Sequence, residues 1–208
     1  MVGNDIIDIK ETQRSTNWER RGFIQKIFSI KEQNLIRASA DPFTTVWRLW
    51  SMKESAYKVY IQAGGERFFG PTRIECSFDS SENGWVKIDN ISLETETVIN
   101  DNYIFSSARV GTLEIDTCIL QLSGVNSKEQ SDFMQQQVLN DFAKSNSMPW
   151  VDLLLQKTRA GVPLLFYKDK PLNISLSITH HGGYGAYSMV KNEGLSDFTA
   201  NNVGQLFF

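Results

Sequence analysis

Residues 47–58, with the sequence WRLWSMKESAYK, form the stretch around which the rest of the chain is organised. Apolar residues recur there at helical spacing without Pro or Gly, which predicts an α-helix. Four apolar residues would share one stripe of this helix, namely Val46, Trp50, Tyr57 and Ile61. Glu54 fills the gap in that stripe, one turn after Trp50. The sequence therefore predicts a carboxylate that faces the protein interior.

A buried Glu54 needs compensation, because an unpaired ionised carboxylate is costly in apolar surroundings. The carboxylate can pair with a base, bind a cation or keep its proton. Lys58 lies four residues on and is a candidate partner. The alternative is an ordinary exposed Glu–Lys pair, which contributes only about 0.3–0.5 kcal/mol. Spacing alone leaves both interpretations open.

The composition is that of an ordinary globular protein of 208 residues, with 41% hydrophobic and 12% aromatic residues. We expect a cytoplasmic protein, because the N-terminal residues lack the pattern of a secretory signal and no apolar run reaches the length of a membrane span. Cys76 and Cys118 have no other Cys nearby in the sequence, and we expect both to be reduced thiols. The adjacent residues His180 and His181 have the wrong spacing for two zinc ligands on one helix.

Charge is distributed unevenly along the chain. Residues 1–60 hold 10 Lys and Arg against 7 Asp and Glu, whereas the remaining residues hold 11 against 17. A basic section in an acidic chain suits an anionic ligand or an acidic protein partner better than nucleic acid. A solvated helix face is the alternative interpretation.

The pattern of elements predicts an α+β fold. The first part would contain a strand at 2–9, a helix at 17–28, a helix at 30–38 opened by a capping box of Ser29 and Glu32, and the helix that carries Glu54, which ends before Gly64. Strands are expected at 72–78, 84–88, 103–110 and 117–122, with Asn83-Gly84 as a hairpin turn. The last part would contain a helix at 127–144 opened by a capping box at Ser127, a short helix at 149–156, and strands at 163–167, 173–179 and 184–190. The order of strand, helices and strands occurs twice, which predicts two similar α+β halves.

Polar residues that could take part in binding or catalysis interrupt two of these strands. Asp5 lies on the first strand, and Asp8, three residues on, would face the opposite side. His180 ends a strand before Gly182-Gly183, where a ligand could approach the backbone closely. The alternatives are a strand-end cap for Asp5 and a hydrogen-bonded surface hairpin for His180.

Three segments together resemble the signature motifs of the 4'-phosphopantetheinyl transferase superfamily. They are Gly3-Asn4-Asp5, residues 50–58 (WSMKESAYK) and residues 177–184 (SITHHGGY), which are similar to G-x-D, W-[ST]-x-K-E-[SA]-x-x-K and S-x-[ST]-H-x-x-x-Y. Residues 23–32 (FIQKIFSIKE) also look like the F-x-x-[RK]-x-F-[ST]-x-x-E segment of this family. The resemblance covers about residues 2–80 and 157–190, and leaves 80–156 without distinctive residues.

The resemblance implies Mg²⁺-dependent transfer of 4'-phosphopantetheine from coenzyme A to a serine of an acyl or peptidyl carrier protein, as in fatty-acid or polyketide biosynthesis. By motif position, Asp5 and Glu54 would bind the metal, and Lys58 would contact the diphosphate. Glu54 or a metal-bound water would take the serine proton. His180 and Lys26 would bind the coenzyme, and Arg159 is a further candidate phosphate contact without a motif position.

The chain departs from the family pattern in two respects. Larger members carry a third acid two residues after the Asp, where this chain has Ile7, whereas Asp8 matches an acid of the small holo-acyl-carrier-protein synthases. A water is therefore expected to replace the third protein ligand. The His motif also comes last, as in the small synthases, although this chain is nearly twice their length.

The resemblance further implies a fused pseudo-dimer that acts as a monomer. Residues 1–110 would form the half with the metal site, and 111–208 the half with the His motif, with one site at the seam. A non-catalytic homologue that binds coenzyme A or a carrier protein is the alternative function, and a structural or interaction protein without either ligand is another. A hydrolase is poorly supported, because no nucleophile has a recognisable base beside it.

Overall fold

The computed structural model describes residues 1–78, 80–112, 114–123 and 126–190. The elements of the first part are β1 (Val2–Asp8), α1 (Ile9–Ser15), α2 (Phe23–Ile27), α3 (Ile30–Ala38), α4 (Pro42–Gln62), the 3-10 turn η1 (Pro71–Arg73), β2 (Ile74–Phe78), β3 (Asn83–Ile88), β4 (Ile91–Ile99) and β5 (Tyr103–Arg109). Those of the second part are β6 (Ile115–Gln121), α5 (Ser127–Ser145), η2 (Trp150–Asp152), β7 (Leu153–Lys157), β8 (Pro163–Tyr167), β9 (Lys170–Pro171), β10 (Leu176–His181) and β11 (Tyr184–Val190).

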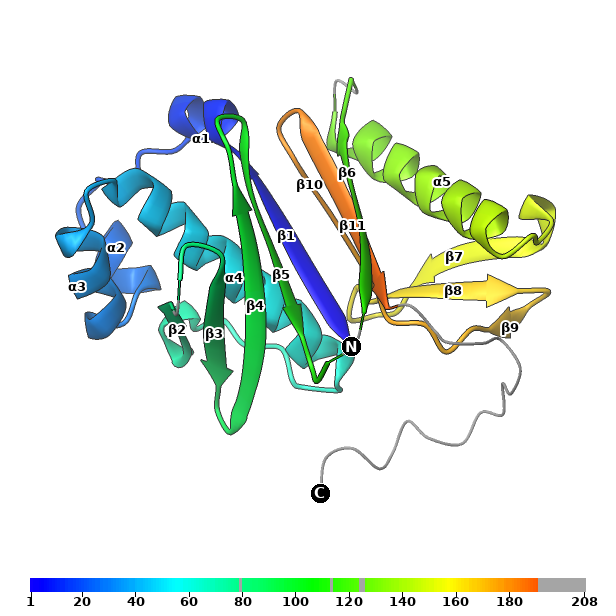
Figure 1. The fold of residues 1–208 in the computed structure, drawn as a ribbon, viewed down its shortest axis with the longest axis horizontal. Helices are drawn as coiled ribbons and strands as arrows, with labels where there is room; N and C mark the ends of the chain where they lie inside the picture. Colours follow the sequence, from blue (N-terminus) through cyan, green and yellow to red (C-terminus); the bar gives the residue numbers. More distant parts are fainter. Residues whose placement is uncertain (79, 113, 124–125, 191–208) are drawn as a thin grey trace.

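The strands form three antiparallel sheets that are covered by helices, which confirms the α+β class. One sheet has the order β1-β5-β4-β3-β2, and the others have the orders β10-β11-β6 and β7-β8-β9. The first sheet and its helices occupy one side of the molecule, and the two smaller sheets with α5 occupy the other (Figure 1). β1 and β10 lie side by side at the seam between the two sides (Figure 1). Among the described residues, no helix has both the length and the apolar character that crossing a membrane requires.

Strand pairing follows a similar pattern on the two sides of the seam. β1 pairs with β5, which pairs with β4, while β6 pairs with β11, which pairs with β10. A long helix, α4 or α5, lies between the first strand of each set and the others in the sequence. This connectivity is consistent with two similar α+β halves. The first sheet ends at Arg109 and the next strand begins at Ile115, and the expected domain boundary at residue 110 stays a prediction.

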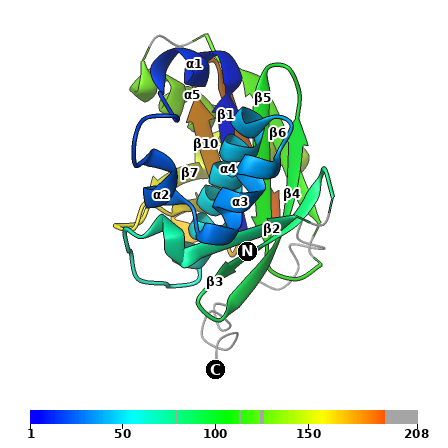
Figure 2. The ribbon, with the colours of Figure 1, turned by 90° about the vertical axis from the view of Figure 1, so that its left-hand side faces the viewer.

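Helix α4 is the central element of the first half. Asp41 caps its N-terminus by accepting the backbone N–H of Thr44 at 3.0 Å, and Pro42 occupies the first turn. The helix lies across the first sheet, and α2 and α3 lie outside it (Figure 2). The helix is covered on most sides, and its fully buried apolar residues are Val46, Leu49, Met52, Ala56 and Val59. The predicted single stripe is therefore wrong in detail, since Trp50 and Tyr57 are only half-buried.

Several predicted elements differ from those of the structure. The predicted helix at 17–28 is reduced to α2, because Gly22 adopts a left-handed conformation with φ 84° just before it. The predicted helix at 149–156 is the short turn η2 followed by β7. In β7, Leu153 and Leu155 are buried whereas Leu154 is exposed, and this period of two belongs to a strand.

Other differences concern turns and caps. The sequence prediction did not include α1 and β4, and it extended the first strand by one residue to Ile9. Asn83 and Gly84 are the first residues of β3 rather than the hairpin turn before it. Helix α5 is capped by Asn126, whose side chain accepts two backbone N–H groups, instead of Ser127. The expected capping box of Ser29 and Glu32 is confirmed.

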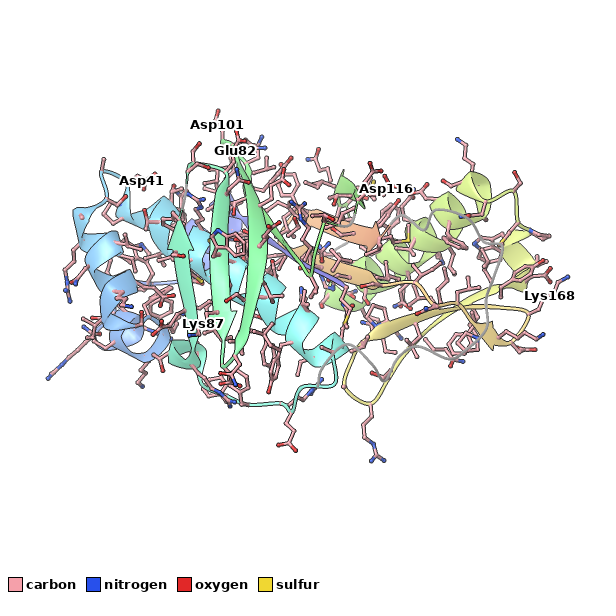
Figure 3. All side chains as sticks on the ribbon, turned by 60° about the horizontal axis from the view of Figure 1, so that its bottom comes forward. Asp41, Glu82, Lys87, Asp101, Asp116 and Lys168 are labelled. Atoms are coloured by element: carbon pink, nitrogen blue, oxygen red, sulfur yellow. The ribbon has the colours of Figure 1, made fainter. Side chains whose placement is uncertain are left out.

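A buried ion pair anchors α4 to the elements outside it. Labelled charged residues such as Asp41, Glu82 and Lys87 lie on the outside of the molecule (Figure 3), whereas Lys53 and Glu32 are almost completely inaccessible and lie 2.9 Å apart. The Lys53 ammonium also donates to the carbonyls of Pro71 and Ile74. The Glu32 carboxylate accepts the backbone N–H groups of Ser29 and Cys76. Every charge of this pair is therefore compensated, which buried ions require.

We expect Lys53→Met to destabilise the protein by about 3–5 kcal/mol, because the variant leaves the Glu32 carboxylate buried without its counter-charge. The free energy of unfolding in urea measures this effect. Lys31→Met is the matched control, because Lys31 is exposed on α3 and should change stability by less than about 0.5 kcal/mol. Equal stability of the two variants would contradict the anchoring role of the pair.

Candidate functional site

The backbone of β1 lies directly against α4 at Gly3. A Cβ atom at this position would lie 2.0 Å from the carbonyl oxygen of Ser55 and 3.1 Å from the Cβ of Lys58. Only a glycine permits this approach. The first residue of the Gly3-Asn4-Asp5 motif therefore brings the strand that carries Asp5 against the helix that carries Glu54.

Asn4 joins the same strand to the second half. Its side-chain amide is fully buried, donates to Ser188 Oγ at 3.1 Å and accepts from Ser177 Oγ at 2.8 Å. The backbone N–H of Asn4 donates to the same Ser177 hydroxyl at 3.0 Å. The second residue of the motif thus fixes β1 against β10 and β11.

Asp5 presents one carboxylate oxygen that has no hydrogen-bond partner. Oδ1 accepts the Thr179 hydroxyl at 3.2 Å and lies 3.5 Å from Lys58 Nζ. Oδ2 is buried without a partner. Burial raises the pKa of Asp5 above its ordinary value, and the positive charge of Lys58 and the Thr179 hydrogen bond oppose this shift. A buried carboxylate oxygen without a partner is a candidate ligand for a cation.

Glu54 is held mostly out of solvent next to Asp5. Burial, reinforced by the negative charge of Asp5, raises the pKa of Glu54 to about 7, while Lys58 acts in the opposite direction. Lys58 Nζ donates to the carbonyl of Asn4 at 2.6 Å and has its ion pair with Asp5. The described contacts of the Lys58 side chain are therefore with β1, and it does not form a surface pair with Glu54.

His180 approaches the same site from β10. Its ring is half-buried, and Nδ1 lies 3.2 Å from Oε1 of Gln130 in α5. Burial and the nearby positive charges of Lys157 and Lys58 lower the pKa of His180 below its ordinary value. The described hydrogen bond of the ring is to α5, on the second side of the seam.

Asp8 faces away from this group and has a structural role. Its carboxylate accepts the backbone N–H of Glu11 at 3.0 Å, which caps α1, and that of Gly183 at 2.8 Å. Its own backbone N–H donates to His181 Nδ1 at 2.9 Å. Asp8 and His181 thereby join the end of β1 to the β10–β11 turn.

Lys26 is the predicted residue that the structure does not connect to the others. It is exposed on α2. Within the described part of the chain, no hydrogen bond or ion pair joins it to Asp5, Glu54 or Lys58, and its assignment to coenzyme binding stays a prediction. Arg159 is likewise exposed, in the turn after β7.

The two carboxylates fit a Mg²⁺ ion better than a metal with several protein ligands. Mg²⁺ commonly binds one or two carboxylates and keeps several waters. The partner-free Oδ2 of Asp5 and the nearby Glu54 supply such a pair. Among the described residues, no group of three His, Cys, Asp or Glu side chains gathers at this or any other place, so the remaining ligands would be waters or substrate oxygens.

Two contacts at the site were not expected from the sequence. Thr179 belongs to a motif segment, but its hydrogen bond to Asp5 depends on the register of β10 against β1. Gln130 lies in the region without distinctive residues, and its contact with His180 spans 50 positions. One Gln among the four of α5 carries no signal by which the sequence could have identified it.

An α+β protein with adjacent carboxylates, a lysine and a histidine at one seam has the groups that bind a divalent cation and a phosphate. The family model of the 4'-phosphopantetheinyl transferase superfamily matches residues 1–112. The chain belongs to this superfamily, because the match covers more than half of its length. Phosphopantetheinyl transfer is therefore the class of reaction that the family assignment supports.

The chain also has a distant similarity to a solved structure. The crystal structure of the holo-[acyl-carrier-protein] synthase of Thermotoga maritima is similar at 10% sequence identity and a TM-score of 0.40. The similarity covers 82% of this chain and 83% of that chain. No curated protein matches the chain significantly in sequence.

We expect the protein without divalent cations to lose stability as the pH rises from about 4.5 to about 7. Folded Glu54, with a pKa of about 7, keeps its proton at pH values where the unfolded residue, near 4.5, has lost it. The loss has an upper limit of about 3.5 kcal/mol at about 1.4 kcal/mol per pKa unit. It should disappear in Glu54→Gln.

Urea unfolding in EDTA at about pH 5 and about pH 8 measures this difference. Glu66→Gln is the matched control, because Glu66 is exposed. The interpretation would be wrong if wild type and Glu54→Gln differed by the same amount at both pH values.

Proposed function

We propose that this protein transfers the 4'-phosphopantetheine group of coenzyme A to a serine of an acyl or peptidyl carrier protein and releases adenosine 3',5'-bisphosphate. The observation that carries the proposal is the partner-free buried Oδ2 of Asp5, next to Glu54 and Lys58. These three residues occupy the expected motif positions, and the chain belongs to the corresponding superfamily.

The reaction demands the groups that gather at this seam. The serine oxygen bonds to the phosphorus that carries pantetheine, and the bond from that phosphorus to the bridging oxygen breaks. The bridging oxygen keeps the electron pair and leaves with adenosine bisphosphate, while the serine proton passes to a base. Bound at Asp5 and Glu54, Mg²⁺ would neutralise negative charge on the diphosphate.

Lys58 and Glu54 would supply the remaining chemistry. The Lys58 ammonium is fixed by Asn4 and Asp5 and would stabilise charge on the leaving phosphate. Glu54 or a metal-bound water is the candidate acceptor for the serine proton. His180 would bind the coenzyme beside Lys58.

The carrier protein would dock on the basic first section. Arg20 and Arg21 are exposed in the turn before α2 and would meet an acidic helix of the carrier. The halves 1–110 and 111–208, the monomeric state and the cytoplasmic location stay predictions of the same proposal.

We expect intact mass spectrometry to detect a gain of one phosphopantetheine group on an apo carrier protein incubated with this protein, coenzyme A and Mg²⁺. Glu54→Ala and Asp5→Asn should lower the initial rate by about 100-fold or more, because each removes a carboxylate that would hold the Mg²⁺ opposite the reacting phosphates. Glu66→Ala is the control and should react like wild type.

Other outcomes decide against parts of the proposal. Stabilisation by coenzyme A in a melting experiment, without any mass gain on several carriers, would favour the non-catalytic binding homologue. A mass gain that persists unchanged in Glu54→Ala would keep the reaction but reject the metal-site assignment.

We expect the double variant Arg20→Glu/Arg21→Glu to raise KM for the carrier protein about 5- to 10-fold, because like charges would oppose docking. KM for coenzyme A should stay within about twofold of wild type. Lys168→Glu/Lys170→Glu is the matched control, because it reverses two exposed charges near β9, at the other end of the molecule from α2 (Figure 1). Equal increases in both KM values would contradict this docking surface.

A further inference from the structure

Two adjacent histidines end β10, and different elements hold them. Neighbouring residues of a strand point to opposite faces. His180 faces Gln130 of α5, whereas His181 faces the backbone of Asp8 at the end of β1. They are the only two histidines of the sequence, so each ring can be observed without interference from others.

The partner of His180 fixes the position of its proton. The amide nitrogen of Gln130 donates to the carbonyl of Gly182 at 2.8 Å, which places the amide oxygen toward the ring. That oxygen lies 3.2 Å from His180 Nδ1 and can only accept. Nδ1 of His180 must therefore carry a proton in both the neutral and the charged ring.

The partner of His181 has the opposite effect. The backbone N–H of Asp8 can only donate, and it lies 2.9 Å from His181 Nδ1. Nδ1 of His181 therefore has a free electron pair, and the neutral ring carries its proton on Nε2. The two neighbouring histidines are thus set to opposite tautomers by their partners.

The turn between β10 and β11 is held from both sides by the same two residues. Gln130 binds the carbonyl of Gly182, and the Asp8 carboxylate accepts the N–H of Gly183 at 2.8 Å. A Cβ on Gly182, whose φ is 56°, would lie 2.4 Å from Asp8 Oδ2. The absence of a side chain lets Asp8 close on the turn, so the His180 backbone has little freedom to move.

We propose that Gln130 is a positioning residue that holds the Nδ1–H group of His180, so that the ring, when it takes up a second proton, donates from Nε2–H to a phosphate of the bound coenzyme. Nε2 points away from Gln130, and the ring lies within the influence of Lys58 and Lys157, whose charges favour an anionic group. The identity of the ligand rests on the proposed function, whereas the tautomer of His180 does not.

Nitrogen-15 NMR of tag-free protein at about pH 8, above the ordinary pKa of an imidazole, tests the assignment. His180 should have a protonated Nδ1 and His181 a protonated Nε2, with His181→Asn used to assign the signals. Gln130→Ala should convert His180 to a mixture dominated by the Nε2-protonated form. Gln136→Ala is the matched control on the same helix, because Gln136 is exposed, and it should leave both rings unchanged.

A further variant separates tautomer control from a general loss of structure. Gln130→Glu keeps an acceptor for Nδ1 and should retain the Nδ1-protonated form, although it loses the donor to Gly182. A wild-type His180 protonated on Nε2, or an unchanged His180 in a folded Gln130→Ala, would overturn the proposal. Retention in Gln130→Glu together with loss in Gln130→Ala would support it.

Kinetics connect the tautomer to the reaction. Gln130→Ala should raise KM for coenzyme A about fivefold, the effect of one hydrogen bond, with kcat within about twofold of wild type. An unchanged KM in a variant with a converted tautomer would reject the coenzyme contact of Nε2. Wild-type protein that transfers nothing, yet has the expected tautomers, would reject the proposed function and leave the role of Gln130 in the free protein intact.

Discussion

The backbone N–H groups on the free edge of β1 need hydrogen-bond acceptors, and the residues that supply these acceptors form the seam of the molecule. β1 pairs with β5 on one side, so its outward backbone N–H groups need other acceptors. Side chains of β10 and of Ser175, which directly precedes it, provide them: Val2 donates to Ser175, Asn4 to Ser177 and Asp8 to His181. Each acceptor lies 173 positions after its donor, so β10 runs beside β1 in one register. That register brings Thr179 to Asp5.

Helix α4 packs directly against β1, and a small residue of the strand permits this close contact. Gly3 removes the side chain that would hold the helix away. Lys58 and Gln62 then reach the carbonyls of Asn4 and Val2 at 2.6 Å. Gln62 also accepts the Ser175 hydroxyl at 2.7 Å, which joins the helix to the second half. One strand is therefore held by a sheet, a helix and the opposite half, and the carboxylate of Asp5 cannot turn away from the seam.

Adjacent residues of α4 treat buried charge in opposite ways. Lys53 is completely compensated by Glu32 and backbone carbonyls, so it stabilises the packing and offers nothing to a ligand. Glu54, one residue on and about 100° around the helix, lies near Asp5, and burial together with the negative charge of Asp5 raises the pKa of Glu54. Lys53 therefore anchors α4, and α4 in turn holds Glu54 in position. A charge that the fold leaves uncompensated next to one that it satisfies is a mark of a functional position.

The sequence by itself determined the α+β class, the extent of α4, the capping box of α3 and the residues that carry the motifs, because local periodicity and side-chain chemistry act over a few positions. It could not reveal that Lys53 is buried in an ion pair, because its partner Glu32 lies 21 positions away. It also predicted a helix where η2 and β7 lie, because short apolar runs suit either structure. Only the tertiary structure decided that Asp8 closes a turn, that Thr179 orients Asp5 and that Gln130 holds His180. Those contacts span 50 to 175 positions, and no local pattern encodes the register of two strands that meet through their side chains.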